Sequence, residues 1–250
     1  MAERGEYTAR RRGWNNENAT VFPATLFDYN GVLIDDEHVH LEAFREVLRP
    51  LGIEVGEREY FARYIGFDDV GMFRAILEDS SKGAEDGLVR QLVDAKRPVY
   101  KKLAERGLRS FAGAAELVRR RASAGPVGIV SGALRDEIEM GLGVLSIKDC
   151  VSAIVAAEDM GAPKPDPAGY LRGIEALAGL AGPEAARRAL VIEDSLPGIQ
   201  AAKSAGLSCI AVAHSYSMEE LRAGGADLVV PTLGELGEQR LGELYRRLHG

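Results

Sequence analysis

Short hydrophobic runs alternate with longer amphipathic stretches along most of the chain. The short runs cover residues 24–31, 126–132, 151–159, 189–195, 208–215 and 226–232. Their valine and isoleucine content and weak alternation are typical of parallel strands that are buried on both faces. Helical patterns lie between the runs and at the C-terminus, notably over 114–123, 197–206 and 233–250. Strands that alternate with helices predict an α/β protein with a doubly wound parallel sheet.

One region departs from this alternation, because residues 36–108 have helical patterns and no convincing strand. We therefore expect an α/β core domain over 24–35 and 109–250, with an inserted α-helical cap domain over 36–108. Residues 1–23 are polar and are expected to form a flexible tail. Open α/β sheets bind ligands at the carboxyl ends of their strands. An insert that leaves from the end of the first strand is therefore expected to cover the site as a lid.

Composition and charge narrow the classes of function. Of the 250 residues, 46% are hydrophobic and 28% are charged, which is enough apolar material for a sizeable packed core. The formal net charge of −7 argues against nucleic acid or an anionic membrane as the main partner. No stretch is apolar over the length of a membrane span, and the N-terminus lacks the hydrophobic segment of a secretory signal. These features predict a cytoplasmic protein, and we expect it to be a monomer.

The polar residues that suggest chemistry all lie at the ends of predicted strands. Asp28 ends the first strand, Ser131 ends the second, Lys164 follows the third, and Glu193 and Asp194 end the fourth. In a parallel sheet these ends converge, and three carboxylates would repel one another there without a cation. Oxygen ligands without a histidine or cysteine cluster favour Mg²⁺ over zinc. A serine hydroxyl and a lysine ammonium beside them suit phosphate oxygens, so the group predicts a phosphoryl-transfer site.

Each of these features has an ordinary structural interpretation when it is taken alone. An aspartate after a strand commonly caps a helix or a turn, and a Ser-Gly pair commonly forms a turn. The segment KPDP could be a stiff loop, and EDS before PG could be a helix N-cap. Their occurrence together, in this order and each at a strand end, favours the catalytic interpretation.

The same residues lie in four longer segments, which are FDYNGVLIDDEHVH, IVSGALRDEI, GAPKPDPAGYL and VIEDSLPGIQAAKSAG. In this order the segments resemble the motifs of the haloacid dehalogenase (HAD) superfamily of Mg²⁺-dependent phosphohydrolases. The resemblance covers about residues 24–232. It is closest to the branch with a helical cap after the first motif, which includes β-phosphoglucomutase and phosphoglycolate phosphatase. It implies a Rossmann-like core, a small phosphorylated metabolite as substrate, and Mg²⁺ as cofactor.

The resemblance assigns the nucleophile and the metal ligands. Asp28 would attack the phosphorus and form an aspartyl-phosphate. Asp28, the backbone carbonyl of Asn30 and Asp194 would hold Mg²⁺. Glu193 would lie beside the metal and bind it directly or through water.

The resemblance also assigns the groups that bind substrate. Ser131, Gly132 and Lys164 would bind the phosphoryl oxygens, and Lys164 would also offset the carboxylates. His40 matches a histidine that is common at the start of the cap in this branch. Taken alone, His40 would more often be an ordinary residue on a polar helix face.

Asn30 is a departure from the family pattern, because phosphatases of this family have an aspartate there. That aspartate protonates the leaving group and later activates water, which is worth about 10²–10⁴-fold in rate. Three interpretations remain open. The first is a slow phosphohydrolase, or one that uses His40, Asp35 or Asp36 as the acid. The second is another HAD chemistry, such as that of a dehalogenase, phosphonatase or phosphomutase. The third is a catalytically impaired or non-catalytic protein that binds a phosphorylated ligand.

The substrate is indicated only by the segment 64–73, where we expect the cap to contact the leaving group. Where β-phosphoglucomutase has basic residues for a second phosphate, this chain has Ile65 and Asp69. This difference favours hydrolysis of a simple monoester over a bisphosphate intermediate. An acidic cap face also favours a neutral or cationic leaving group.

Overall fold

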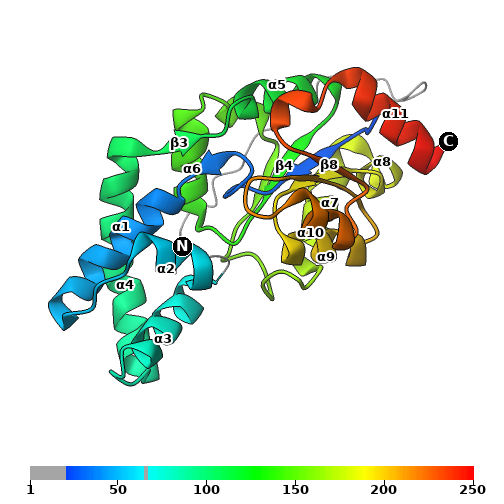
Figure 1. Cartoon of the computed structure of the whole chain (residues 1–250). Helices are drawn as coiled ribbons and strands as arrows, with labels where there is room; N and C mark the ends of the chain where they lie inside the picture. The colour runs from blue at the N-terminus through cyan, green and yellow to red at the C-terminus, as the bar shows by residue number, and fades with distance from the viewer. Residues whose placement is uncertain (1–20, 65–66) are drawn as a thin grey trace. The chain divides into compact units, whose positions relative to one another are not determined.

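The computed structural model describes residues 21–64 and 67–250 of the chain (Figure 1). The contacts divide the chain into two compact units. Of the described residues, 21–34 and Ser110–Gly250 form an α/β unit, and those within Asp35–Arg109 form a helical unit. The helical unit therefore interrupts the α/β unit along the chain.

The α/β unit is built on a six-stranded parallel sheet with the order β5–β4–β1–β6–β7–β8. The strands are β1 (Thr25–Phe27), β4 (Val127–Val130), β5 (Ala153–Val155), β6 (Leu190–Glu193), β7 (Ser208–Val212) and β8 (Leu228–Val230). Each strand lies inside one of the six hydrophobic runs, which confirms the predicted doubly wound fold. The chain runs from β1 outward through β4 and β5, then returns to the other side of β1 as β6. The carboxyl ends of β1 and β6 therefore meet where the strand order reverses, which is where such sheets bind ligands.

Helices cover both faces of this sheet. Figure 1 shows α5 (Ala114–Ala124) and α11 (Glu238–His249) on one face. On the other face lie α7 (Ala168–Ala181), α9 (Leu196–Ser204) and α10 (Met218–Ala223). The remaining elements are α6 (Arg135–Val144), α8 (Pro183–Arg187) and the 3-10 turns η3 (Lys148–Cys150) and η4 (Leu233–Glu235). The helices expected over 114–123 and 197–206 correspond to α5 and α9.

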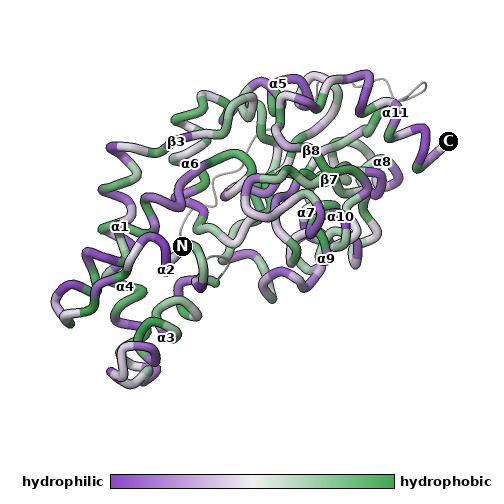
Figure 2. Tube along the Cα trace, viewed as in Figure 1, coloured by the Kyte–Doolittle hydropathy of each residue, from purple (hydrophilic) through white to green (hydrophobic). Residues whose placement is uncertain are grey.

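Successive side chains of β1 contact helices on opposite faces of the sheet. Leu26 packs toward α7, where Gly173 leaves the space, because a Cβ at Gly173 would lie 3.1 Å from Leu26. Thr25 points to the opposite face, where its Oγ1 accepts a hydrogen bond of 3.0 Å from Arg121 on α5. Figure 2 shows the hydrophobic residues concentrated along β7 and β8, whereas the exposed turns of α11 are hydrophilic. Alternate β1 side chains therefore hold β1 at the centre of the core.

In its described residues, the helical unit has four helices around a core of its own. They are α1 (Glu37–Leu48), α2 (Glu57–Glu59), α3 (Asp69–Asp79) and α4 (Asp86–Gly107), with η1 (Arg49–Leu51) after α1 and η2 (Tyr60–Tyr64) after α2. Aromatic rings fill the core, where Phe44 and Phe73 lie 4.8 Å apart between ring centroids. The short strands β2 (Ile34–Asp35) and β3 (Arg109–Ser110) pair with each other.

The N-terminal end of the described chain differs from the predicted tail. The tail was expected to extend to residue 23, and its first 20 residues lie outside the described part of the chain. Phe22 is instead buried, and its ring packs edge-on against Tyr245 of α11 at 5.2 Å. Its carbonyl also accepts a hydrogen bond from the buried Arg121. In the described residues, no helix combines the length and hydrophobicity that crossing a membrane requires.

Candidate active site

The first part of the site is a tight turn that follows β1 and begins at Asp28. The amides of Leu33 and Ile34 both donate to the carbonyl of Tyr29, at 2.8 and 3.0 Å, and the amide of Gly31 donates to Ile34 at 2.9 Å. Gly31 has a φ of +75°, and a Cβ on it would lie 2.0 Å from Oδ2 of Asp194. Glycine is therefore required here both for the left-handed backbone and for close contact with the end of β6.

Glu193 forms the second part of the site, and its carboxylate accepts hydrogen bonds from five donors. Oε1 accepts from Lys164 Nζ at 2.6 Å and from Tyr170 at 2.7 Å. Oε2 accepts from the amides of Asp194 and Ser195, at 3.0 and 3.2 Å, and from the Ser195 hydroxyl at 3.0 Å. A Cβ on Gly198 would lie 1.9 Å from this carboxylate, so the first turn of α9 closes directly on it. Both oxygens of this fully buried side chain are therefore already well supplied with donors.

Lys164 links Glu193 to Asp28. Its ammonium lies 2.8 Å from Asp28 Oδ1, and its side chain is 14% exposed, so both salt bridges are largely desolvated. Lys164 follows β5 in the segment that leads to α7, and Asp28 follows β1, so the contact joins residues 136 positions apart. The sequence predicted that these strand ends converge, and the structure shows these groups in direct contact.

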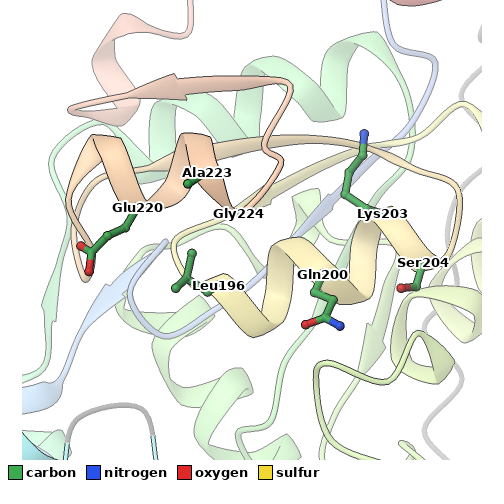
Figure 3. A pocket seen from close by; sticks show the side chains of 7 residues that line it. All are labelled: Leu196, Gln200, Lys203, Ser204, Glu220, Ala223 and Gly224. Atoms are coloured by element: carbon green, nitrogen blue, oxygen red, sulfur yellow. The ribbon is translucent and has the colours of Figure 1, made fainter.

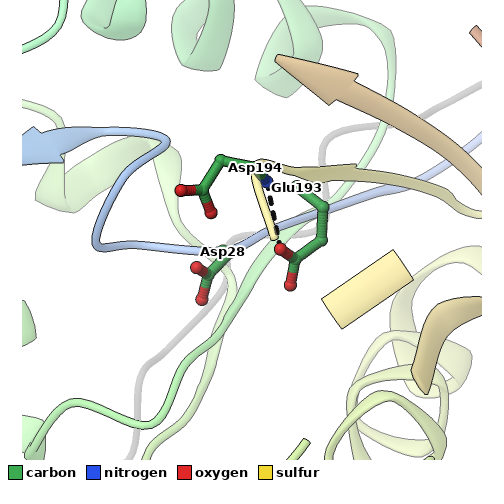
Figure 4. A group of neighbouring side chains, drawn as sticks. All are labelled: Asp28, Glu193 and Asp194. Atoms are coloured by element: carbon green, nitrogen blue, oxygen red, sulfur yellow. Dashed lines mark hydrogen bonds between the residues drawn. The ribbon is translucent and has the colours of Figure 1, made fainter. Parts of the chain in front are cut away.

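Asp28, Glu193 and Asp194 form a cluster of three buried carboxylates. One oxygen from each lies within 4.8 Å of the others (Figure 4). With the Lys164 ammonium included, three negative charges and one positive charge leave the ionised group at −2. A buried charge of this size is costly unless a cation neutralises it. The cluster therefore fits a hard divalent cation such as Mg²⁺, which prefers oxygen ligands.

The acidities of the carboxyl groups reflect this environment. Burial raises the pKa of Asp28 to about 6, and the neighbouring Lys164 offsets only part of that effect. Burial and the charges of Glu193 and Asp28 raise the pKa of Asp194 well above its usual range. Burial also acts to raise the pKa of Glu193, but Lys164 and Tyr170 together hold it below its usual value. Without a cation, Glu193 is therefore a stable carboxylate, whereas Asp28 and Asp194 resist ionisation.

Ser131 and Asn30 lie beside one another. Ser131 follows β4, and its amide donates to Val155 at 3.0 Å, which fixes the start of the loop. Its hydroxyl lies 3.4 Å from Asn30 Oδ1, a long hydrogen bond. Gly132 is the next residue of the same loop, and a Cβ there would meet no atom within 4 Å. The predicted phosphate-binding serine therefore contacts the side chain that departs from the family pattern.

His40 lies in the helical unit, on α1. Its Nε2 is 3.2 Å from Oδ2 of the buried Asp36, and its Nδ1 is 2.8 Å from Lys96 Nζ. Lys96 is only 1% exposed, forms a salt bridge with Asp69, and lies 4.2 Å from the centroid of the Phe44 ring. No pattern in the sequence distinguishes Lys96 from the other lysines of the helical unit, because a lysine within a long charged helix usually points to solvent.

Three further residues around the cluster were not among the site residues predicted from the sequence. Tyr170 donates to Glu193, the Ser215 hydroxyl donates to Oδ2 of Asp194, and His214 Nδ1 lies 2.8 Å from the carbonyl of Gly31. Ser215 and His214 end the hydrophobic run 208–215, so the rule that found the other strand ends also applies to them. Tyr170 carries no such signal, because its position depends on how α7 packs.

A separate groove lies between α9 and α10 (Figure 3). Its volume is about 670 Å³. The lining residues are Leu196, Gln200, Lys203, Ser204, Glu220, Ala223 and Gly224. It contains none of the clustered carboxylates, and Lys203 is already paired with Asp227 at 2.8 Å. The groove is therefore distinct from the candidate active site.

The chain belongs to the haloacid dehalogenase-like hydrolase family, whose profile matches residues 25–212. Among its relatives is the validoxylamine A 7'-phosphate phosphatase of Streptomyces hygroscopicus subsp. limoneus, which is 28% identical over 89% of this chain and 99% of the relative. Another is the protein CbbY of Rhodobacter capsulatus, which is 29% identical over 88% of this chain and 98% of the relative.

Solved structures show the same fold. The β-phosphoglucomutase of Clostridium difficile superposes with a TM-score of 0.75 at 22% identity, over 91% of this chain and 98% of that protein. A variant of CbbY from Rhodobacter sphaeroides, in complex with xylulose-(1,5)bisphosphate, has a TM-score of 0.72 at 26% identity, over 87% of this chain and 96% of that one. The predicted membership of the HAD superfamily is therefore confirmed, and the chain is a hydrolase of this family.

Proposed function

We propose that the protein is a Mg²⁺-dependent phosphomonoester hydrolase that acts on a small phosphorylated metabolite through an aspartyl-phosphate. The observation that carries this proposal is the buried cluster of Asp28, Glu193 and Asp194 with Lys164 between two of the carboxylates. The family match and the phosphatase relatives agree with it.

In the proposed reaction, a carboxylate oxygen of Asp28 attacks the phosphorus, and the bond from phosphorus to the ester oxygen breaks. The departing alkoxide takes a proton from water, and a water molecule then hydrolyses the acyl phosphate to release phosphate and regenerate Asp28. Lys164 holds Asp28 Oδ1 at 2.8 Å, which keeps the nucleophile in place and provides positive charge beside the transferring group. The Ser131 hydroxyl, from the neighbouring strand end, would donate to a phosphoryl oxygen.

The metal would be held by Asp28, by the backbone carbonyl of Asn30 and by Asp194. When bound, Mg²⁺ would neutralise the carboxylates and stabilise negative charge on the transferring phosphoryl group. Five donors occupy the oxygens of Glu193, and this favours a supporting role for Glu193 over direct coordination. Glu193 would then orient Lys164 and the start of α9.

Asn30 makes the proposed enzyme slow. An amide does not transfer a proton at neutral pH, whereas the acid–base aspartate of the family contributes about 10²–10⁴-fold. This residue is also the reason for a second candidate function, a phospholigand-binding protein with the same fold and little turnover. The two candidates share the cluster and differ only in the rate of chemistry.

The direct test is the Asn30→Asp variant with one aryl and one alkyl phosphate in the presence of Mg²⁺. The alkyl ester has a poor leaving group, so its turnover should rise by about 10²-fold or more, and the aryl ester should respond less. An unchanged alkyl rate would show that position 30 is not the missing acid. Asp28→Asn is the control and should lose all turnover. A parent protein that binds phosphate ligands without detectable turnover would support the binding function instead.

The helical unit supports a monoester as the substrate. We propose that this unit is the cap domain that selects the leaving group. Asp69 stands where a basic residue would serve a second phosphate, and it neutralises the buried Lys96. Ile65, the other residue on which this prediction rests, lies outside the described residues. The CbbY variant from Rhodobacter sphaeroides was crystallised with xylulose-(1,5)bisphosphate, so a panel of matched monoesters and bisphosphates tests the difference. Faster hydrolysis of the bisphosphates would contradict this part of the proposal.

A further inference from the structure

The connection between β7 and α10 contacts the carboxylate cluster through two consecutive side chains. His214 Nδ1 lies 2.8 Å from the carbonyl oxygen of Gly31, in the turn that follows Asp28. The next residue, Ser215, donates its hydroxyl to Oδ2 of Asp194. One short segment therefore contacts both the turn after β1 and the carboxylate after β6.

The chemistry of the His214 contact is defined by its partner. A carbonyl oxygen only accepts hydrogen bonds, so Nδ1 of His214 must carry the proton. The ring is held in place by Phe111, with the two ring centroids 3.7 Å apart and the planes only 11° from parallel. Phe111 in turn donates its amide to the carbonyl of Leu33 at 3.1 Å, in the same turn. The imidazole therefore has one defined orientation toward Gly31.

The backbone of the connection is also anchored. The amide of Ala213 donates to Val230 of β8 at 2.9 Å, and the amide of His214 donates to Val212 at 2.9 Å. Ser217 then caps α10, because its hydroxyl accepts from the amide of Glu220 at 3.2 Å. His214 and Ser215 thus project from a segment that is fixed at both ends. The segment can therefore hold Gly31 and Asp194 in place.

The two contacts meet where the turn after β1 packs closely against Asp194. Gly31 approaches Asp194 so closely that a Cβ would lie 2.0 Å from Oδ2. Movement of either partner would change the distance between Asp194 and the turn that carries Asn30. Resting on the proposed function, we infer that His214 and Ser215 are positioning residues that set the geometry of the Mg²⁺ site by holding Gly31 and Asp194.

Substitution of a residue that hydrogen-bonds a metal ligand typically lowers the metal affinity by about 10–100-fold. His214→Ala and Ser215→Ala should each weaken Mg²⁺ binding by about that factor, measured by calorimetry on the substrate-free protein. His214→Asn should recover most of the lost affinity, because its side-chain amide can donate to the Gly31 carbonyl from a similar position. Ser215→Thr keeps the hydroxyl and should also bind nearly as well as the parent.

Ser217→Ala is the matched control, because it lies in the same connection and removes the cap of α10 without touching the cluster. It should lower the melting temperature and leave the Mg²⁺ affinity at the parental value. If His214→Ala and Ser215→Ala remain folded and bind Mg²⁺ as the parent does, the inference is overturned while the proposed function stands. If the parent itself binds no Mg²⁺, both the inference and the proposed function fail. The inference would also be overturned if Ser217→Ala lost as much Mg²⁺ affinity as His214→Ala and Ser215→Ala. Any loosening of the segment would then be enough to weaken Mg²⁺ binding.

Discussion

The cost of ionising Asp28 in the metal-free protein can be worked out from its surroundings. Burial raises the pKa of this carboxyl from 3.8 to about 6, despite the nearby Lys164. A difference of about 2 units corresponds to about 3 kcal/mol, because each unit is worth about 1.4 kcal/mol. The folded state binds the proton more tightly than the unfolded state does. This contribution to stability is therefore complete below pH 3.8 and is lost as the pH rises through about 6.

The assay is urea unfolding of chelator-treated parent and Asp28→Asn proteins at several pH values. The variant has no carboxyl to ionise at position 28, so the difference between the two curves reports the ionisation of Asp28 together with its effect on the neighbouring carboxyl of Asp194. Relative to the variant, the parent should lose about 2 kcal/mol of unfolding free energy between about pH 4.5 and about pH 7. Saturating Mg²⁺ should abolish that loss in the parent, since the cation favours the ionised form.

A difference between the two proteins that stays constant with pH would refute the reasoning, because Asp28 would then titrate normally. A difference that grows in the opposite direction would show that Lys164 dominates and lowers the pKa. Either result would also remove one argument for a cation at the cluster.

Three further variants test the contacts around the two cores by urea unfolding. Gly31→Ala should cost about 2 kcal/mol through the left-handed backbone and the clash with Asp194, and a parental midpoint would contradict this packing. Tyr170→Phe should lose about 2 kcal/mol, because it removes a buried hydrogen bond to a charged group, and no loss would mean that Glu193 is satisfied without it. Asp69→Ala should cost about 3 kcal/mol by leaving Lys96 buried without its partner, and adding Lys96→Met should restore much of that. Failure of the double variant to recover would show that Lys96 is not the source of the penalty.

The strands of the α/β unit could be predicted because parallel strands covered on both faces need continuous hydrophobic runs. All six runs became strands, and the residues at their ends converge as the topology requires. The contact between Lys164 and Asp28 follows from that rule alone, although 136 residues separate them in the sequence.

Other parts of the site depend on packing that no local pattern reveals. Tyr170 reaches Glu193 only because small residues let α7 approach the sheet, including Gly173 against Leu26. Lys96 is buried because Phe44, His40 and Asp69 surround it, and they come from other helices. Phe22 was assigned to a polar tail by the composition around it, but it fills a gap against Tyr245. Each of these features is decided by tertiary contacts.

The five donors around Glu193 restrict what this position can be chemically. A carboxylate offers only acceptors, and all five neighbouring groups donate to it. Glutamine has the same shape, but its amide nitrogen would face either Lys164 or the amides that start α9, with donor opposed to donor. Aspartate is one methylene shorter and would not span the distance from the end of β6 to both groups of donors. Neither glutamine nor aspartate can therefore replace Glu193 and keep these hydrogen bonds, although both substitutions are usually regarded as conservative. This conclusion does not depend on any part that Glu193 takes in catalysis.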